Sequence, residues 1–82
     1  MDINRATEAT DEVSATVDDI FEYHPWNEAQ VAQGRGVRNI LAQAVKTILT
    51  NVPPSQDRST AIRKIREARM DCNSAITHRG KY

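Results

Sequence analysis

The sequence predicts an all-α protein in which a short N-terminal helix precedes a long antiparallel helical hairpin, in an oligomeric helical bundle. Apolar residues recur at intervals of three and four along three segments, as they do on the buried face of a helix. Pro25 and Pro53-Pro54 separate these segments, and Gly80 is placed like a C-terminal helix cap. No segment alternates apolar and polar residues as a strand does, so no β-sheet is expected.

The first helix is expected to run from Thr7 or Thr10 to Glu22. Acidic side chains follow Thr10 directly, where the helix dipole favours negative charge. Phe21 is expected to lie in the core. The apolar face comprises Val13, Val17, Ile20 and Phe21.

The second helix is expected from Asn27, a plausible N-cap, to Asn51. Gly34 and Gly36 weaken its first half by about 1 kcal/mol each relative to alanine. Either the regular helix starts after Gly36, or the glycines permit close approach by a neighbour or a ligand. The apolar stripe comprises Val37, Leu41, Ala44, Ile48 and Val52, widened by Ile40 and Val45.

The third helix is expected from Ser55, an N-cap that follows two prolines, to about Arg79. It joins the second helix through Val52-Pro53-Pro54, which favours an antiparallel hairpin. Its small residues allow a partner helix to come close. The seam, spaced by fours and threes, comprises Ala61, Ile65, Ala68, Cys72, Ala75 and finally Arg79.

Length sets the next expectation, because 82 residues form one domain at most and bury little surface. Cys72 is the single cysteine, which excludes an intrachain disulfide, and the histidines lack zinc-ligand spacing. Oligomerisation is the remaining support. The sequence contains no apolar run of about 18 residues, so no membrane span is expected, and no secretory leader is recognisable. Together with the single cysteine, this favours a reducing cytoplasm.

The charges are sorted along the chain, although the formal net charge is zero. Residues 1–28 carry eight acidic side chains and one basic one, whereas residues 29–82 carry three acidic and ten basic ones. Most of the bases are arginine, whose planar fork suits phosphate. The basic part therefore either binds an anionic partner or pairs with the chain's own acidic segment.

Aromatic residues gather where the first helix should end. Phe21, Tyr23 and Trp26 fall close together, and rings beside arginines can stack on nucleobases or can instead seal the end of a bundle. No glycine-rich phosphate loop, nucleophile–base set or metal motif is present, so an enzyme is not expected. His24 and His78 are interpreted as structural.

Two segments together resemble the phage anti-CBASS sponge proteins, whose shared unit is a helical hairpin. One is Phe21-x-Tyr23-His24-Pro25. The other is Pro54-Ser55-x-x-Arg58-Ser59-x-Ala61-x-x-x-Ile65-x-Glu67-Ala68-x-Met70-x-x-Asn73-x-Ala75-Ile76-x-x-Arg79. The resemblance covers about residues 20–80. It divides the chain into an acidic helical extension, residues 1–18, and a hairpin domain that binds cyclic nucleotides, residues 19–82.

This resemblance implies a non-catalytic sponge that sequesters cyclic dinucleotides and cyclic trinucleotides in the host bacterial cytoplasm and so blocks CBASS immunity. It implies a compact homohexamer, a trimer of dimers whose two-fold and three-fold axes match the symmetries of the two ligands. No cofactor, metal, membrane or DNA partner is expected.

The resemblance also assigns roles to residues. Tyr23 would stack on a base of the dinucleotide, Arg38 would contact its phosphate, and Arg79 would serve the trinucleotide. The remaining expected ligand-binding residues are His24, Pro25, Ser59 and Asn73. Two alternatives stay open: a small helical nucleic-acid-binding or regulatory protein, and a protein-interaction module whose acidic and basic parts pair between subunits.

Overall fold

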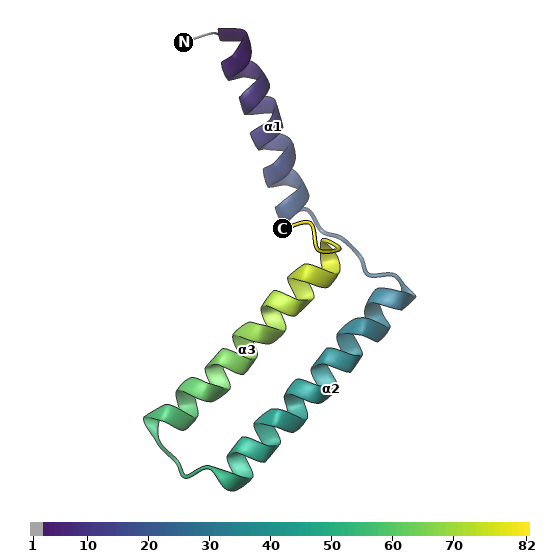
Figure 1. Cartoon of the computed structure of the whole chain (residues 1–82). Coiled ribbons are helices and arrows are strands. Elements are labelled where there is room, and N and C mark those ends of the chain that lie inside the picture. Colours follow the sequence, from purple (N-terminus) through teal and green to yellow (C-terminus); the bar gives the residue numbers. More distant parts are fainter. Residues whose placement is uncertain (1–2) are drawn as a thin grey trace.

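Three helices make up the computed structural model, which describes the backbone of residues 3–82 and the side chains of residues 11–82. They are α1 (Ile3–Phe21), α2 (Glu28–Asn51) and α3 (Gln56–Thr77). The helices α2 and α3 lie side by side as an antiparallel hairpin, and α1 extends away from its open end (Figure 1). Over the described residues there is no strand, which confirms the all-α class. The helix α1 begins earlier than the threonines at which a start was expected.

The start of α2 is fixed by a capping box. Asn27 Oδ1 accepts a hydrogen bond from the Gln30 backbone N–H at 2.8 Å, and Gln30 Oε1 accepts one from the Asn27 N–H at 3.0 Å. These two bonds satisfy amide groups that a helix terminus leaves without partners. The helix then continues through Gly34 and Gly36 without interruption, so a start after Gly36 is wrong.

The closed end of the hairpin is held by local contacts of the turn. Ser55 is the N-cap of α3, and its Oγ accepts a hydrogen bond from the Arg58 N–H at 3.1 Å. Arg58 Nη1 donates in turn to the carbonyl oxygen of Val52 at 3.2 Å. The Ser55 cap is therefore confirmed, and the short turn is tied to both helices.

The facing sides of α2 and α3 follow most of the predicted stripes. The half-buried residues are Val37, Leu41, Ala44, Val45 and Ile48 on α2 and Ala61, Ile65, Ala68 and Cys72 on α3. Two members of the α2 stripe are corrected, because Ile40 is 72% exposed and Val52 is 39% exposed. Near the end of α3 the neighbouring Ile76 takes the half-buried position, and Ala75 is exposed.

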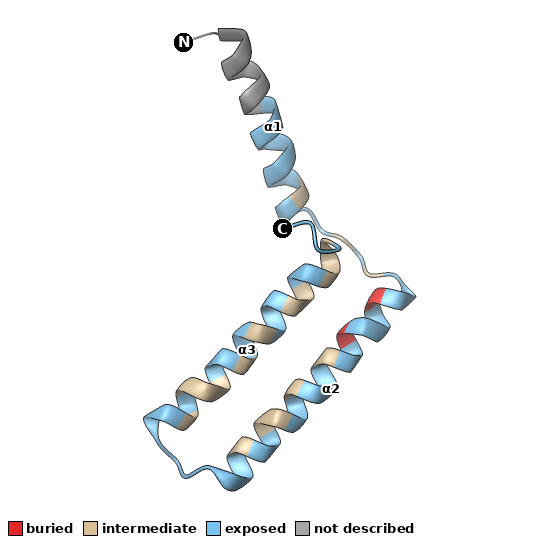
Figure 2. Ribbon diagram, viewed as in Figure 1, coloured by how far each residue is buried: buried red, intermediate tan, exposed pale blue. Residues whose placement is uncertain are grey.

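Residues 11–82 of the single chain form no buried apolar core. Among residues 11–82 no apolar side chain is buried, and the most enclosed polar one is Gln30, at 8% exposure (Figure 2). Phe21, expected in the core, is 82% exposed, because α1 packs against neither α2 nor α3 within the described residues. A hairpin that buries so little apolar surface has weak support for an isolated fold.

Candidate functional site

The open end of the hairpin is held together by Trp26. Its indole Nε1 donates a hydrogen bond to Thr77 Oγ1 at 2.8 Å, which joins the α1–α2 linker to the last residue of α3. The ring lies so close to α2 that a Cβ atom at Gly34 would overlap it, whereas a Cβ at Gly36 would meet open space. Gly34 therefore permits close approach by a neighbour, the second of the two interpretations given above, and Trp26 acts as the aromatic plug.

A second tie crosses the hairpin next to this ring. Gln30 Nε2 donates to the carbonyl oxygen of Ile76 at 2.9 Å, while the other end of the same side chain caps α2. Because Gln30 is 8% exposed, breaking one of these bonds leaves a buried polar group without a partner. They set the position of residues 22–27, in which Tyr23, His24 and Pro25 lie.

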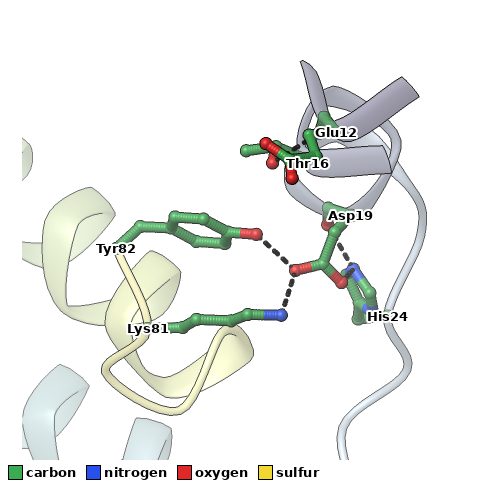
Figure 3. Close-up of polar contacts among 6 residues, drawn as sticks. All are labelled: Glu12, Thr16, Asp19, His24, Lys81 and Tyr82. Carbon is green, nitrogen blue, oxygen red and sulfur yellow. Dashed lines mark hydrogen bonds and ion pairs between the residues drawn. The ribbon is translucent and has the colours of Figure 1, made fainter. Parts of the chain in front are cut away.

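The base of α1 is attached to the C-terminal tail through Asp19 (Figure 3). One carboxylate oxygen accepts hydrogen bonds from Lys81 Nζ at 3.0 Å and from the Tyr82 hydroxyl at 2.5 Å. His24 Nε2 lies 2.6 Å from the Asp19 backbone oxygen, a distance at which the ring donates to the carbonyl. The rings of His24 and Tyr82 each meet His78 edge to face, with centroids 5.3 and 5.2 Å apart.

These contacts keep the carboxylate ionised. The hydrogen bond from Tyr82, followed by that from Lys81, lowers the pKa of Asp19 below its ordinary value. The same bonds raise the pKa of Lys81 and of Tyr82, because each proton is held by the Asp19 carboxylate. The tail is thus fastened by a charge-assisted contact that persists around neutral pH.

An open cavity of about 310 Å³ lies at this end of the hairpin. It brings together three of the residues predicted from the sequence, His24, Pro25 and Arg79. Tyr23 borders an adjoining hollow with Trp26 and Thr77, and its side chain is 85% exposed. The other residues around the cavity are Asp19, Gln30, Thr77, His78 and Lys81.

Arg79 does not lie on the α3 seam, where it was expected, because α3 ends at Thr77. Its backbone is left-handed, with φ of 55°. The Arg79 N–H bonds to the Ile76 carbonyl at 3.2 Å, and the Gly80 N–H bonds to the Ala75 carbonyl at 2.9 Å. This pattern is a Schellman motif, and it puts arginine at the position that glycine usually occupies. Gly80 was predicted as the cap, but it stands one residue later in the motif.

The other predicted site residues lie elsewhere on the hairpin. Arg38 borders a shallow groove between α2 and α3, well along α2 from the open end. Asn73 is half-buried on α3, and Ser59 is exposed on the first turns of α3 at the closed end. One chain therefore brings Tyr23, His24, Pro25 and Arg79 to one end, and the cavities there are not lined by Arg38, Asn73 or Ser59.

Sequence reasoning missed the attachment of α1 to the tail. Asp19 was counted only among the acidic side chains of residues 1–28, and Lys81 and Tyr82 were given no role. The whole hairpin lies between these partners, which are 62 and 63 residues apart in sequence, and no periodicity links them. The signal that pointed toward them was the charge sorting, since Asp19 belongs to the acidic part and Lys81 to the basic part.

Comparisons with known proteins add no relative. No protein-family model matches the chain, and searches of curated proteins and of solved structures found no match either. In the described part of the chain, no helix is long and apolar enough to cross a membrane. Those residues also contain no cluster of His, Cys, Asp and Glu able to hold a metal ion.

Proposed function

We propose that this chain is a non-catalytic sponge that binds and sequesters cyclic di- and trinucleotide messengers, and so blocks the CBASS immunity of a bacterial host. The proposal rests on the resemblance of residues 20–80 to the anti-CBASS sponge proteins and on the chemistry of the hairpin's open end. Sequestration needs affinity and no reacting group, which agrees with an open end that presents Arg79, two histidines and, beside them, the ring of Tyr23.

The observation that carries the proposal is the backbone of Arg79. A left-handed conformation costs a residue other than glycine about 1–2 kcal/mol, and Arg79 adopts it beside a glycine that would accept it freely. Strained residues of this kind cluster at sites of function. Here the strained residue borders the cavity, and its guanidinium offers paired N–H groups for a phosphate.

Tyr23 supplies the second element of the proposed site. Its ring is 85% exposed on a linker that Trp26 anchors to the hairpin, so the ring is presented to solvent from a fixed backbone. Stacking of a base on an aromatic ring contributes about 1–3 kcal/mol and does not depend on which base it is. A fixed linker also lowers the ordering cost of binding.

Assembly of several copies is part of the same proposal. Tyr23 and Arg38 lie at different places on one chain, so a dinucleotide pocket that uses both draws them from different copies. A two-fold interface would present both residues twice to a two-fold symmetric ligand, and a three-fold axis would bring three Arg79 side chains to a trinucleotide. A homohexamer, a trimer of dimers, contains both axes.

Calorimetric titration with a panel of cyclic di- and trinucleotides tests the proposal, with a short single-stranded DNA as control. Saturable binding of a cyclic nucleotide that is recovered intact by chromatography is expected, at half a site per chain for two-fold pockets and a third for three-fold ones. Tyr23→Ala should abolish dinucleotide binding, and Arg79→Ala should abolish trinucleotide binding. Both variants should still assemble as the parent does. Binding of the DNA alone, with a steep salt dependence, would favour the nucleic-acid-binding alternative.

A further inference from the structure

The helix α1 carries an apolar stripe that no other part of the described chain, residues 11–82, covers. Val13, Val17, Ile20 and Phe21 share one face and are 61%, 45%, 37% and 82% exposed. The helix extends away from the hairpin (Figure 1), and its described part is coloured mostly as exposed (Figure 2). An amphipathic helix owes most of its stability to packing of its apolar face. We therefore expect the apolar stripe of α1 to pack against another surface.

The charges on α1 restrict what that partner is. Between residues 11 and 22 there are five acidic side chains and no basic one, namely Asp11, Glu12, Asp18, Asp19 and Glu22. Asp18 and Glu22 line a hollow together with Val17 and Phe21, so carboxylates border one edge of the stripe. A second α1 is a poor partner, because like charges would be brought together. The complementary surface is an apolar strip edged by bases.

The hairpin has such a surface in the groove that contains Arg38. Its floor is apolar, its volume is about 160 Å³, and three arginines edge it. Within residues 11–82 none of the three makes an ion pair with an acidic side chain. The floor comprises Leu41, Ala42, Val45 and Ile65, and the edge comprises Arg38, Arg66 and Arg69.

The chain's own α1 does not reach this groove while the contacts at the open end are made. Asp19 is bound to the tail by Lys81 and Tyr82, and Trp26 holds the linker against α2 and α3. From that attachment α1 runs away from α2 and α3, which line the groove (Figure 1). A second copy is free of this restriction and carries the same helix.

We propose that the hairpin groove edged by Arg38, Arg66 and Arg69 is the docking site for α1 of a second copy of this chain. The stripe from Val13 to Phe21 lies on the apolar floor, and Asp18 and Glu22 lie beside the arginines. Docking removes from water apolar surface that each chain leaves exposed, and each buried square ångström contributes about 25 cal/mol. The interface requires no nucleotide, so it stands or falls separately from the proposed sponge function.

Charge reversal in separate chains tests the docking. One variant carries Asp18→Arg and Glu22→Arg, and the other carries Arg66→Glu and Arg69→Glu. Each alone should weaken self-association at least about tenfold in analytical ultracentrifugation, because attraction becomes repulsion. Mixing the two should restore association as a mixed assembly, since each then offers the charge that the other lacks. Arg63→Glu with Lys64→Glu is the matched control on α3, outside the groove, and should change association little.

A cysteine pair separates docking between chains from docking within one. In a Cys72→Ser background, Val17→Cys with Ala42→Cys should form disulfides between chains under mild oxidation, seen as dimers and higher species on non-reducing gels. Disulfides within single chains would show that α1 folds back onto its own hairpin, and would overturn the proposal. The proposal would also be overturned if both charge-reversed variants associated as tightly as the parent. The same holds if the mixture of the two variants associated no more tightly than either variant alone.

Discussion

Replacing Arg79 by glycine is expected to stabilise the fold while it removes the proposed trinucleotide site. In the present chain the left-handed backbone, with φ of 55°, costs about 1–2 kcal/mol. Glycine removes that cost but adds about 0.5–1 kcal/mol of conformational entropy to the unfolded chain. The balance favours Arg79→Gly by about 0.5–1 kcal/mol. Few substitutions at a proposed binding residue are expected to stabilise a protein.

The size of the chain makes this difference measurable. For a domain of 60–100 residues, 1 kcal/mol shifts the melting temperature by about 4–8 °C, so Arg79→Gly should raise it by about 2–8 °C. Calorimetry or circular dichroism at one fixed protein concentration is the assay, because self-association makes the midpoint concentration-dependent. Arg79→Ala is the matched control: it removes the guanidinium but keeps the strained backbone, so its melting temperature should stay close to that of the parent.

The melting temperatures and ligand binding of Arg79→Gly and Arg79→Ala together test whether the Arg79 backbone is strained and whether its guanidinium contacts the ligand. A melting temperature for Arg79→Gly equal to or below that of Arg79→Ala would show that the left-handed conformation carries no strain, and Arg79 would lose its main support as a functional residue. If Arg79→Gly is more stable and both variants lose trinucleotide binding, the parent chain keeps a destabilising residue at this position because that residue binds the ligand. If both bind as the parent does, the guanidinium is not a contact.

Three further predictions follow from the open end of the hairpin. Gly34→Ala should lower the unfolding free energy by about 1–3 kcal/mol in denaturant titration, because the new methyl group displaces the indole of Trp26, whereas Gly36→Ala should raise it by about 1 kcal/mol through helix propensity. Trp26→Phe should cost about 1 kcal/mol in the same assay, through the lost hydrogen bond to Thr77. The lowered pKa of Asp19 means that the attachment of the tail is fully present above the ordinary pKa of about 3.9 and is lost as the pH falls through the lowered value. Nuclear magnetic resonance of the Tyr82 ring should report that loss in acid, and in Asp19→Asn already at pH 7; an unchanged spectrum of Asp19→Asn would contradict the assignment.

Local signals allowed the helices and their caps to be predicted from the sequence. Asn27 and Ser55 act on amides three residues away, so a short stretch of sequence contains the whole interaction. The periodicity of α2 likewise gave the half-buried side, but it did not tell where that side ends, and Ile40 proved exposed beside half-buried Leu41. An apolar stripe shows which side of a helix faces its partner, but how many residues on that side become buried depends on the shape of the partner helix.

Contacts between distant segments were not predictable in the same way. The hydrogen bond of Trp26 joins the linker to Thr77 at the end of α3, and that of Tyr82 joins the C-terminal tail to Asp19 in α1. Neither leaves a periodic pattern, and the sequence left open whether Gly34 weakens the helix or admits a neighbour, which proved to be the ring of Trp26. The error at Arg79 has a local cause: Gly80 was predicted as the cap, whereas Arg79 holds the left-handed position of the motif and Gly80 follows it.

The missing core gives assembly and binding a common physical origin. Residues 11–82 bury no apolar side chain, so surfaces that would be interior in a larger domain are left to be covered by other copies or by a ligand. Arg38 illustrates the overlap, since it edges the groove proposed for α1 and is also the proposed phosphate contact. If both assignments hold, carboxylates of α1 and phosphates of a dinucleotide compete for that arginine. Dinucleotide affinity should then rise in the Asp18→Arg, Glu22→Arg variant even as its self-association weakens. A parallel fall in both would instead mean that the docked helix helps to build the dinucleotide pocket.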